Sequence, residues 1–195
     1  MLNRILFFVR HGQYRSTALP EEEPDGPLTE TGQEQARLTA QRLREYPVAV
    51  IHHSNMQRAE ETASSIAASL PTVALRPSPL LRECIPCVPP GFESHFTPIP
   101  PQFVQKGERQ AQEAFAAYVK PLTDEESDQY EIVVSHGNLI NYLACRAVNA
   151  PKEAWINFDI QQCGLTEIIV HANGWIKLTR HNDAGHLPLL LQRFT

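Results

Sequence analysis

The sequence lacks an excess of positive charge. Its 195 residues include 17 lysines and arginines against 22 aspartates and glutamates, so the formal net charge is -5. Proteins that bind nucleic acids normally present a basic face, and this acidic balance argues against a nucleic-acid partner. Any site for an anion must then be a local cationic pocket on an acidic protein.

Long apolar runs and a dense cysteine framework are also missing. No apolar stretch approaches the roughly 20 residues of a membrane-spanning helix, so we expect no membrane partner. The first apolar run begins within a few residues of Met1, which leaves no room for a signal peptide in this sequence. Four irregularly placed cysteines do not form a secreted disulfide scaffold in a chain of this length. We therefore expect reduced thiols and a cytoplasmic location.

The rest of the composition is that of an ordinary globular protein, with 42% apolar and 20% charged residues. A chain of this length can bury one sizeable core, so we expect a single domain over residues 1–195. Apolar runs at 5–9, 48–51, 73–76 and 130–135 alternate with amphipathic stretches. This alternation predicts an α/β three-layer sandwich, with a mostly parallel sheet and helices on both faces.

Several further segments have recognisable local patterns. Thr31 begins a capping box that predicts a helix over 32–46, and Ser54 begins a second box before the next helix. The proline-rich segment 84–105 is predicted to be an irregular surface loop, which at this length is usually functional. The leucines at 189–191 are expected to pack within the chain.

Arginine and histidine side chains directly follow two of the expected strands. Arg10-His11-Gly12 follows the first run, and His136-Gly137 follows the strand at 130–135. In an open α/β sheet, ligands lie just beyond the carboxyl ends of the strands. Arginine offers a fork of donors for phosphate oxygens, and histidine offers a nucleophilic nitrogen. Each motif alone is short, and a strand that ends in an ordinary polar loop is an equal alternative.

Arg58 lies in the first turn of an expected helix, where a cation is electrostatically unfavourable. An arginine placed there to bind an anion explains this position, because the anion would also meet free N–H groups. The helix after His136 offers an anion the imidazole together with main-chain N–H donors such as that of Gly137. With Glu83 added, the set contains two guanidinium groups, two imidazoles and one carboxylate. Such a set suits phosphoryl transfer with no metal and no cofactor.

Five blocks of the sequence, in order, resemble the histidine phosphatase superfamily with its phosphoglycerate-mutase-like fold. The blocks are Arg10-His11-Gly12, 28–36, 56–63, Leu81-Arg82-Glu83 and 135–138. The similarity extends from about residue 4 to residue 187. Within the superfamily, the chain is most similar to the mitochondrial phosphoglycerate-mutase-like serine/threonine protein phosphatase branch.

The resemblance implies a two-step mechanism. His11 would attack phosphorus and become a phosphohistidine, and Glu83 would protonate the leaving alcohol and then activate water. The transferring phosphoryl oxygens would be held by Arg10, Arg58, His136 and Gly137. The sequence departs from the family pattern at Gln13-Tyr14-Arg15, where many members carry a small hydroxyl residue and an asparagine. The protein-phosphatase branch carries a membrane anchor and an assembly segment, and we expect neither of them here.

The substrate is inferred from the segment after Glu83, which has no lysine or arginine before Lys106. A mutase would need extra cations for a second anionic group, so we favour a phosphatase. Phosphoserine or phosphothreonine in a protein is favoured over a small phosphoester. Gln13, Arg15 and Arg82 are candidate substrate ligands, although Arg82 is as readily a structural ion-pair partner.

Several alternatives stay open at this point. They are a small-molecule phosphatase, a phosphoglycerate mutase, and a non-catalytic protein that docks phosphorylated partners. Docking alone would not require a nucleophile and an acid. Cys84 and Cys87 form a single CxxC pair, and zinc would need two further ligands. A redox switch there is a second alternative, and two reduced thiols are our interpretation. A homodimer is common in this family and is a further expectation.

Overall fold

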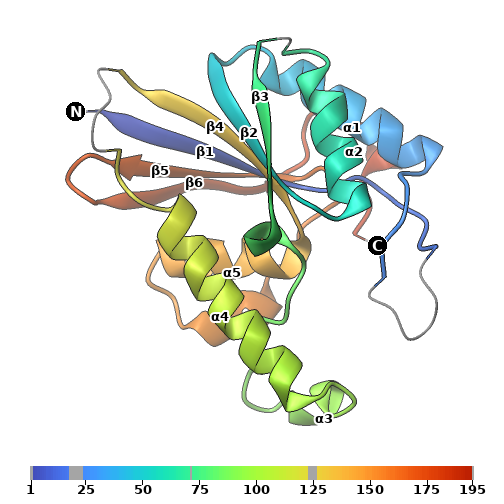
Figure 1. The fold of residues 1–195 in the computed structure, drawn as a ribbon, viewed down its shortest axis with the longest axis vertical. Coiled ribbons are helices and arrows are strands. Elements are labelled where there is room, and N and C mark those ends of the chain that lie inside the picture. The colour runs from blue at the N-terminus through green and yellow to red at the C-terminus, as the bar shows by residue number, and fades with distance from the viewer. Residues whose placement is uncertain (1, 18–23, 71, 123–126, 195) are drawn as a thin grey trace.

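The computed structural model describes residues 2–17, 24–70, 72–122 and 127–194. These residues contain a six-stranded sheet with helices on both faces (Figure 1). The strands are β1 (Asn3–Arg10), β2 (Val48–Ser54), β3 (Ala74–Ser78), β4 (Gln129–Ser135), β5 (Leu165–His171) and β6 (Ile176–Asp183). The helices are α1 (Glu30–Leu43), α2 (Gln57–Ala67), α3 (Glu93–Phe96), α4 (Pro101–Tyr118) and α5 (Gly137–Ala147). Short 3₁₀ turns cover Pro79–Leu81, Lys152–Asn157 and Leu189–Leu191.

The strand order is β3-β2-β4-β1-β5-β6. The first four strands in that order are parallel, and β5 and β6 are antiparallel to their neighbours. The predicted α/β fold with a mostly parallel sheet is therefore confirmed. Because β1, β2 and β4 run in the same direction, their last residues, Arg10, Ser54 and Ser135, lie along one edge of the sheet.

The continuous apolar sequence of β1 is explained by burial of both faces. Leu6 and Phe8 pack in a core with residues of α4 and α5. Ile5, Phe7 and Val9 face the opposite way and pack with residues of α1 and α2. Figure 1 shows the same division, with α1 and α2 on one side of the sheet and α4 and α5 on the other. Side chains alternate across a strand, so one run of five apolar residues supplies both cores.

Both predicted capping boxes are wrong. Helix α1 begins at Glu30, and its cap is Thr29, whose Oγ1 accepts the N–H of Gly32 at 3.1 Å. Two threonines two residues apart offered alternative starts, and the earlier one is used. Helix α2 has Met56 at its N-cap position and no side-chain hydrogen bond from that residue.

Two predictions about irregular segments also need correction. Residues 84–105 are not wholly irregular, because they include α3 and the first residues of α4. Pro101 begins α4, a position where the missing proline N–H costs nothing. Leu189 and Leu190 do not pack within the chain, since they are 82% and 81% exposed. Only Leu191 of this trio contacts a buried cluster.

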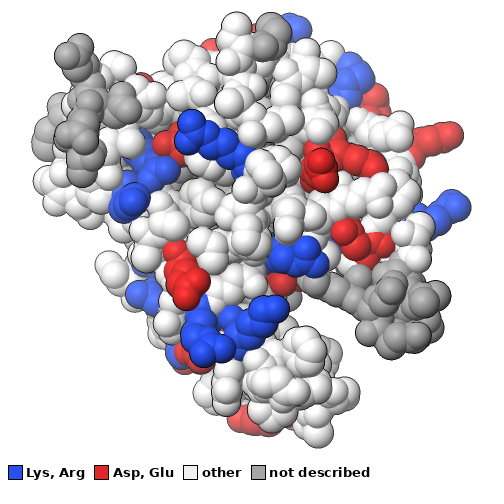
Figure 2. All heavy atoms as spheres, in the orientation of Figure 1, with Lys and Arg blue, Asp and Glu red and all other residues white. Residues whose placement is uncertain are grey.

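The surface in Figure 2 carries lysine and arginine side chains interspersed with aspartate and glutamate. Among the described residues in view, lysine and arginine side chains form no extended basic patch. None of the helices in the described part of the chain combines the length and the apolar character needed to cross a bilayer.

A buried ion pair joins the amino-terminal ends of β1 and β4. Arg4 donates through Nε and Nη2 to the two carboxylate oxygens of Glu131 at 2.8 and 2.7 Å, and through Nη1 to the carbonyl of Tyr118 at 2.7 Å. His52 contacts the same carboxylate at 3.2 Å. Burial alone would raise the pKa of Glu131, but hydrogen bonds from His52 and Arg4 outweigh it and lower this pKa to about 2.

Replacing one member of this pair should strongly destabilise the fold. We expect Arg4→Met to lower the free energy of unfolding by about 3–5 kcal/mol, because a buried carboxylate loses its main partner. The native carboxylate stabilises the fold above its unfolded pKa near 4.5, and that contribution is lost as the pH falls toward about 2. The difference in unfolding free energy between wild type and Arg4→Met should therefore decrease as the pH falls over that range. Urea unfolding at several pH values measures both effects.

The double variant Arg4→Met/Glu131→Gln is the matched control. It removes both charges, so we expect it to recover part of the stability lost in the single variant. A single variant as stable as wild type would show that the pair contributes little.

Candidate active site

His11 follows the end of β1 and is 3% exposed. Its Nδ1 lies 2.8 Å from the carbonyl oxygen of Gly12. A carbonyl can only accept, so Nδ1 carries the proton and Nε2 presents a lone pair. The main chain is fixed on both sides, because His11 N donates to Ser135 O at 3.0 Å and Gly12 N donates to Thr62 Oγ1 at 3.0 Å. Burial and the neighbouring Arg58 hold the pKa of His11 well below its usual value, so the ring is neutral.

Arg58 brings the first turn of α2 against His11. Its Nε donates to His11 Nε2 at 3.1 Å, and its guanidinium carbon lies 4.6 Å from the centre of the Tyr14 ring. Its Nη1 donates to the carbonyl of Pro24 at 2.7 Å and to Asp25 Oδ1 at 3.1 Å. The guanidinium is thus held from three sides, while its Nε–H points at the lone pair of His11 Nε2.

The N-terminus of α2 is capped from a distant loop. Asp25 accepts the N–H of Gln57 at 2.8 Å and that of Arg58 at 3.4 Å. The expectation that a bound anion would meet free N–H groups at this helix end is therefore wrong. The negative group that compensates the cation in the first turn belongs to the protein itself.

His136 lies on the other side of the site, between β4 and α5. Its ring centre is 5.1 Å from that of His11. Its Nε2 lies 2.9 Å from Ser54 Oγ, which also accepts the N–H of Met56 at 3.3 Å. The serine hydroxyl can donate to Nε2, which places the ring proton on Nδ1. That Nδ1 is buried and has no partner among the described residues. Burial and the neighbouring His11 hold the pKa of His136 well below its usual value, so the ring is neutral, and in the tautomer in which Ser54 donates to Nε2, its Nδ1 carries the proton.

Arg10 is the last residue of β1 and extends toward the chain's last described residues. Its Nη1 donates to the main-chain carbonyls of Ile160 and Phe194. Its Nε is buried without a partner in the described part of the protein. This Nε lies 3.6 Å from the position that a Cβ on Gly137 would occupy. Helix α5 begins at Gly137 and has no side-chain cap. The unpaired guanidinium N–H of Arg10 therefore lies beside the N-terminus of α5, where Glu83 accepts the Asn138 N–H, and this arrangement suits an anion.

Glu83 follows the short turn after β3 and lines the same region as Arg10 and Gly137. Its Oε1 accepts the N–H of Cys84 at 3.1 Å. Burial raises the pKa of Glu83 to about 7, against the lowering effects of the Cys84 N–H and of Arg58 and Arg10. A carboxyl group with this pKa can hold and release a proton near neutral pH.

The structure thus brings together all five residues that the sequence selected for chemistry: Arg10, His11, Arg58, Glu83 and His136. The three candidate substrate ligands differ among themselves. The Oε1 of Gln13 accepts from Thr29 at 2.7 Å and supports the loop rather than the site. Arg15 is exposed on that loop. Arg82 contacts Asn55 at 3.1 Å and contributes to lowering the pKa of His136, so it lies near the site.

Sequence reasoning missed the residues that hold the site together. Asp25, Ser54 and Thr62 contact Arg58, His136 and the Gly12 main chain. The sequence pattern marks Ser54 only as a helix cap. Its position at the end of β2, on the same sheet edge as Arg10, was the available signal. Nothing local to Asp25 indicated its partner more than 30 residues away.

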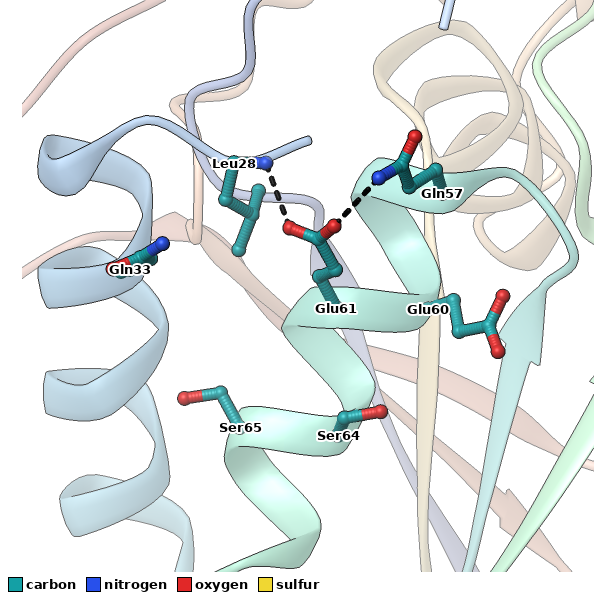
Figure 3. A pocket seen from close by; sticks show the side chains of 7 residues that line it. All are labelled: Leu28, Gln33, Gln57, Glu60, Glu61, Ser64 and Ser65. Atoms are coloured by element: carbon teal, nitrogen blue, oxygen red, sulfur yellow. Dashed lines mark hydrogen bonds between the residues drawn. The ribbon is translucent and has the colours of Figure 1, made fainter. Parts of the chain in front are cut away.

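A separate hollow lies between α1 and α2 (Figure 3). It is lined by Leu28, Gln33, Gln57, Glu60, Glu61, Ser64 and Ser65. Its central carboxylate, Glu61, accepts the main-chain N–H of Leu28 and the side-chain amide of Gln57, each at 2.8 Å. None of the five site residues lines this hollow, and its carboxylate already has partners.

The cysteine pair beside Glu83 is not joined by a disulfide. Burial raises the pKa of the Cys87 thiol, which lowers its reactivity. Within the described ranges, no three histidine, cysteine, aspartate or glutamate side chains gather as ligands for a metal ion.

Comparison with known proteins decides the family. The family model of the histidine phosphatase superfamily (branch 1) matches residues 6–86 and 93–184. The chain belongs to the histidine phosphatase superfamily. It is 36% identical over 188 residues to the mitochondrial serine/threonine-protein phosphatase PGAM5 of Rattus norvegicus, with 95% of this chain and 64% of that protein covered. This histidine phosphatase chain therefore spans less than two thirds of the length of that relative.

Solved structures support the same fold. The phosphoglycerate mutase of Plasmodium falciparum is 26% identical, with a TM-score of 0.67 over 97% of this chain and 96% of that one. Bacillus stearothermophilus YhfR is 20% identical, with a TM-score of 0.73 over 94% of this chain and 98% of that one. At that identity the second likeness concerns the fold alone.

The predicted cytoplasmic location is wrong. The PGAM5 relatives from rat, mouse and human are all named mitochondrial. Reduced thiols were the basis of the prediction, but they distinguish reducing from oxidising compartments and not one reducing compartment from another.

Asp25 offers a test of how the histidine phosphatase site is assembled. We expect Asp25→Ala to lower kcat/KM for phosphoester hydrolysis about tenfold, because Arg58 loses a partner that fixes its guanidinium. The same change should cost about 1 kcal/mol of stability, because α2 loses its cap. Steady-state kinetics and urea unfolding measure the two effects separately.

Asp25→Asn separates capping from charge. Asparagine caps helices as well as aspartate does, so this variant should regain the stability and only part of the activity. A variant at Asp25 that loses stability but keeps kcat/KM would contradict a positioning role for this carboxylate.

Proposed function

We propose that this protein is a metal-independent phosphatase that hydrolyses phosphomonoesters through a phosphohistidine intermediate. The observation that carries the proposal is the buried, neutral His11 with its unprotonated Nε2 beside Arg58. A site for phosphate docking alone needs cations but not a nitrogen nucleophile or a carboxylic acid with a pKa near 7.

In the first step, His11 Nε2 forms a bond to phosphorus while the bond from phosphorus to the ester oxygen breaks. Arg58 Nε must turn from His11 to a phosphoryl oxygen for the lone pair to become available. The unpaired Arg10 Nε, the His136 Nδ1–H and the main-chain N–H of Gly137 supply further donors to these oxygens. Protonated Glu83 gives its proton to the leaving oxygen, so that the product is an alcohol.

In the second step, ionised Glu83 takes a proton from water as the water oxygen attacks phosphorus. The bond between phosphorus and His11 Nε2 breaks, inorganic phosphate leaves, and both residues return to their starting states. One carboxyl group can serve in both directions because its pKa lies near the working pH.

Phosphoserine or phosphothreonine in a protein is the proposed substrate class. The PGAM5 relatives are named serine/threonine-protein phosphatases. The segment from Cys84 to Gln105 contains no lysine or arginine that would favour a second anionic group on the substrate. The expected homodimer stays a prediction.

The experiment that tests the proposal is phosphate release in the presence of a chelator. A phosphothreonine peptide, 4-nitrophenyl phosphate and 3-phosphoglycerate are offered side by side. Release from the first two substrates supports the proposed reaction and substrate class. Release from 3-phosphoglycerate alone would keep the chemistry and replace the substrate class. No release from any of them would favour a docking protein.

A further inference from the structure

A cavity of about 420 Å³ adjoins the site on the side of Glu83. Its walls come from Arg10 and Glu83, from the first turns of α5, from residues 155–160 and from Phe194. Under the proposed function, Glu83 protonates the leaving oxygen, so this carboxyl group marks the leaving-group side. The part of the substrate beyond the phosphoester must therefore enter this cavity.

Asn141 lines this cavity and carries an unused hydrogen-bond acceptor. The side chain is on α5 and is 5% exposed. Its Nδ2 donates to the carbonyl of Phe158 at 2.9 Å, which identifies the other amide atom as Oδ1. That oxygen is buried and has no hydrogen-bond partner among the residues described. Leaving a buried acceptor unsatisfied is costly, and such groups are rare in folded proteins. A ligand that brings an N–H or O–H donor would remove this cost.

The charges around the cavity favour a donor-rich substrate over a second anion. Among the described residues, three charged side chains line it, namely Arg10, Glu83 and Asp159. Arg10 is the sole cation among them, and in the proposed reaction it contacts the phosphoryl group. Glu83 is protonated in the first step of that reaction, so Asp159 supplies the remaining negative charge of the cavity. The side chains of Phe158 and Phe194 are partly exposed and add apolar surface.

We propose that this cavity is a subsite for the peptide that carries the phosphorylated residue. In it, Asn141 Oδ1 accepts a main-chain N–H next to that residue, and Asp159 favours a basic neighbouring side chain. The inference rests on the proposed function and deepens it, because it assigns the residues that distinguish a phosphopeptide from a small phosphoester. A free carboxylate or second phosphate would meet the carboxylate of Asp159 and be disfavoured.

The first test compares two substrates in one variant. Asn141→Ala removes the acceptor, and kcat/KM is measured for a phosphothreonine peptide and for 4-nitrophenyl phosphate. We expect the ratio of the two values, peptide over aryl phosphate, to fall about tenfold, which is the effect of one lost hydrogen bond. Asn173→Ala is the matched control, because Asn173 lies in the exposed turn between β5 and β6 at the opposite end of the sheet. Its ratio should equal that of wild type.

The second test uses charge and does not depend on how well Asn141→Ala folds. Peptides with lysine or glutamate beside the phosphothreonine are compared in wild type and in Asp159→Asn. This change keeps an oxygen that can accept the N–H of Ile160, as Asp159 does at 2.9 Å. We expect wild type to prefer the lysine peptide about threefold to fivefold and the variant to lose that preference.

Each outcome has a distinct meaning. An unchanged ratio in Asn141→Ala, or an equal loss on both substrates, would overturn the role of this amide. A wild type without preference between the two peptides would overturn the role of Asp159. If wild type hydrolyses neither the peptide nor the aryl phosphate, the proposed function itself fails. Hydrolysis of the aryl phosphate without the peptide would leave the function standing and remove the subsite.

Discussion

His11→Ala should lower kcat for hydrolysis of a phosphothreonine peptide by at least about 10⁴-fold, as removal of a catalytic nucleophile does in other enzymes. The ring is buried, its Nδ1–H is fixed by the Gly12 carbonyl, and Nε2 is its only nitrogen with a free lone pair. No other histidine can take over. The nearest ring, His136, is bonded through Nε2 to Ser54 and presents Nδ1 from the other side.

The measurement is phosphate release together with trapping of the phosphoenzyme. Wild type quenched during turnover should carry an alkali-stable, acid-labile phosphoryl group, and His11→Ala should carry none. His171→Ala is the matched control, because His171 is the last residue of β5 and pairs with Asn3 at the end of the sheet away from the site. An active His11→Ala protein, or an equal loss in the control, would contradict covalent catalysis by His11.

The sheet could be predicted because its evidence is local. Five consecutive apolar residues in β1 must be buried on both faces, and the structure divides them between two cores. The site residues could be selected for a related reason. Arg10 ends β1, His11 directly follows it, and His136 directly follows β4, so parallel pairing alone brings them to one edge.

The supports of the site could not be predicted because they depend on contacts between distant segments. Asp25 caps α2 and holds Arg58 across 33 residues, although a local serine offered a more familiar cap. Asn141 looks like one polar residue in an apolar helix. Only its bond to Phe158 and its unpaired oxygen distinguish it from a satisfied core amide.

Glu83→Gln should lower kcat for the phosphothreonine peptide by about 10²–10⁴-fold, the usual contribution of a positioned acid or base. Glutamine keeps the shape and can still accept the N–H of Cys84, but it can neither give a proton to the alkoxide nor take one from water. Steady-state phosphate release measures the loss. Glu113→Gln on the exposed face of α4 is the matched control and should be fully active.

Titration of the Glu83 carboxyl group should also determine how the activity of wild type depends on pH. The first step requires the protonated acid, and burial raises the pKa of Glu83 to about 7. For the peptide, kcat/KM should therefore fall tenfold per pH unit above about pH 7. His11 does not add a second limb near neutrality, because its pKa is well below its usual value and it stays neutral there. A rate that stays flat well above neutrality would contradict Glu83 as the acid.

Comparing substrates with different leaving groups distinguishes the role of Glu83 as an acid from its role as a base. The nitrophenolate of 4-nitrophenyl phosphate leaves without help from an acid, so Glu83→Gln should still form the phosphohistidine and release one equivalent of nitrophenol rapidly. The second step still needs a base, and the phosphoenzyme should then accumulate. A burst followed by slow turnover is therefore expected with the aryl ester, and no burst with the peptide. If the variant loses both steps equally on both substrates, the carboxyl group supports the structure of the site and not proton transfer.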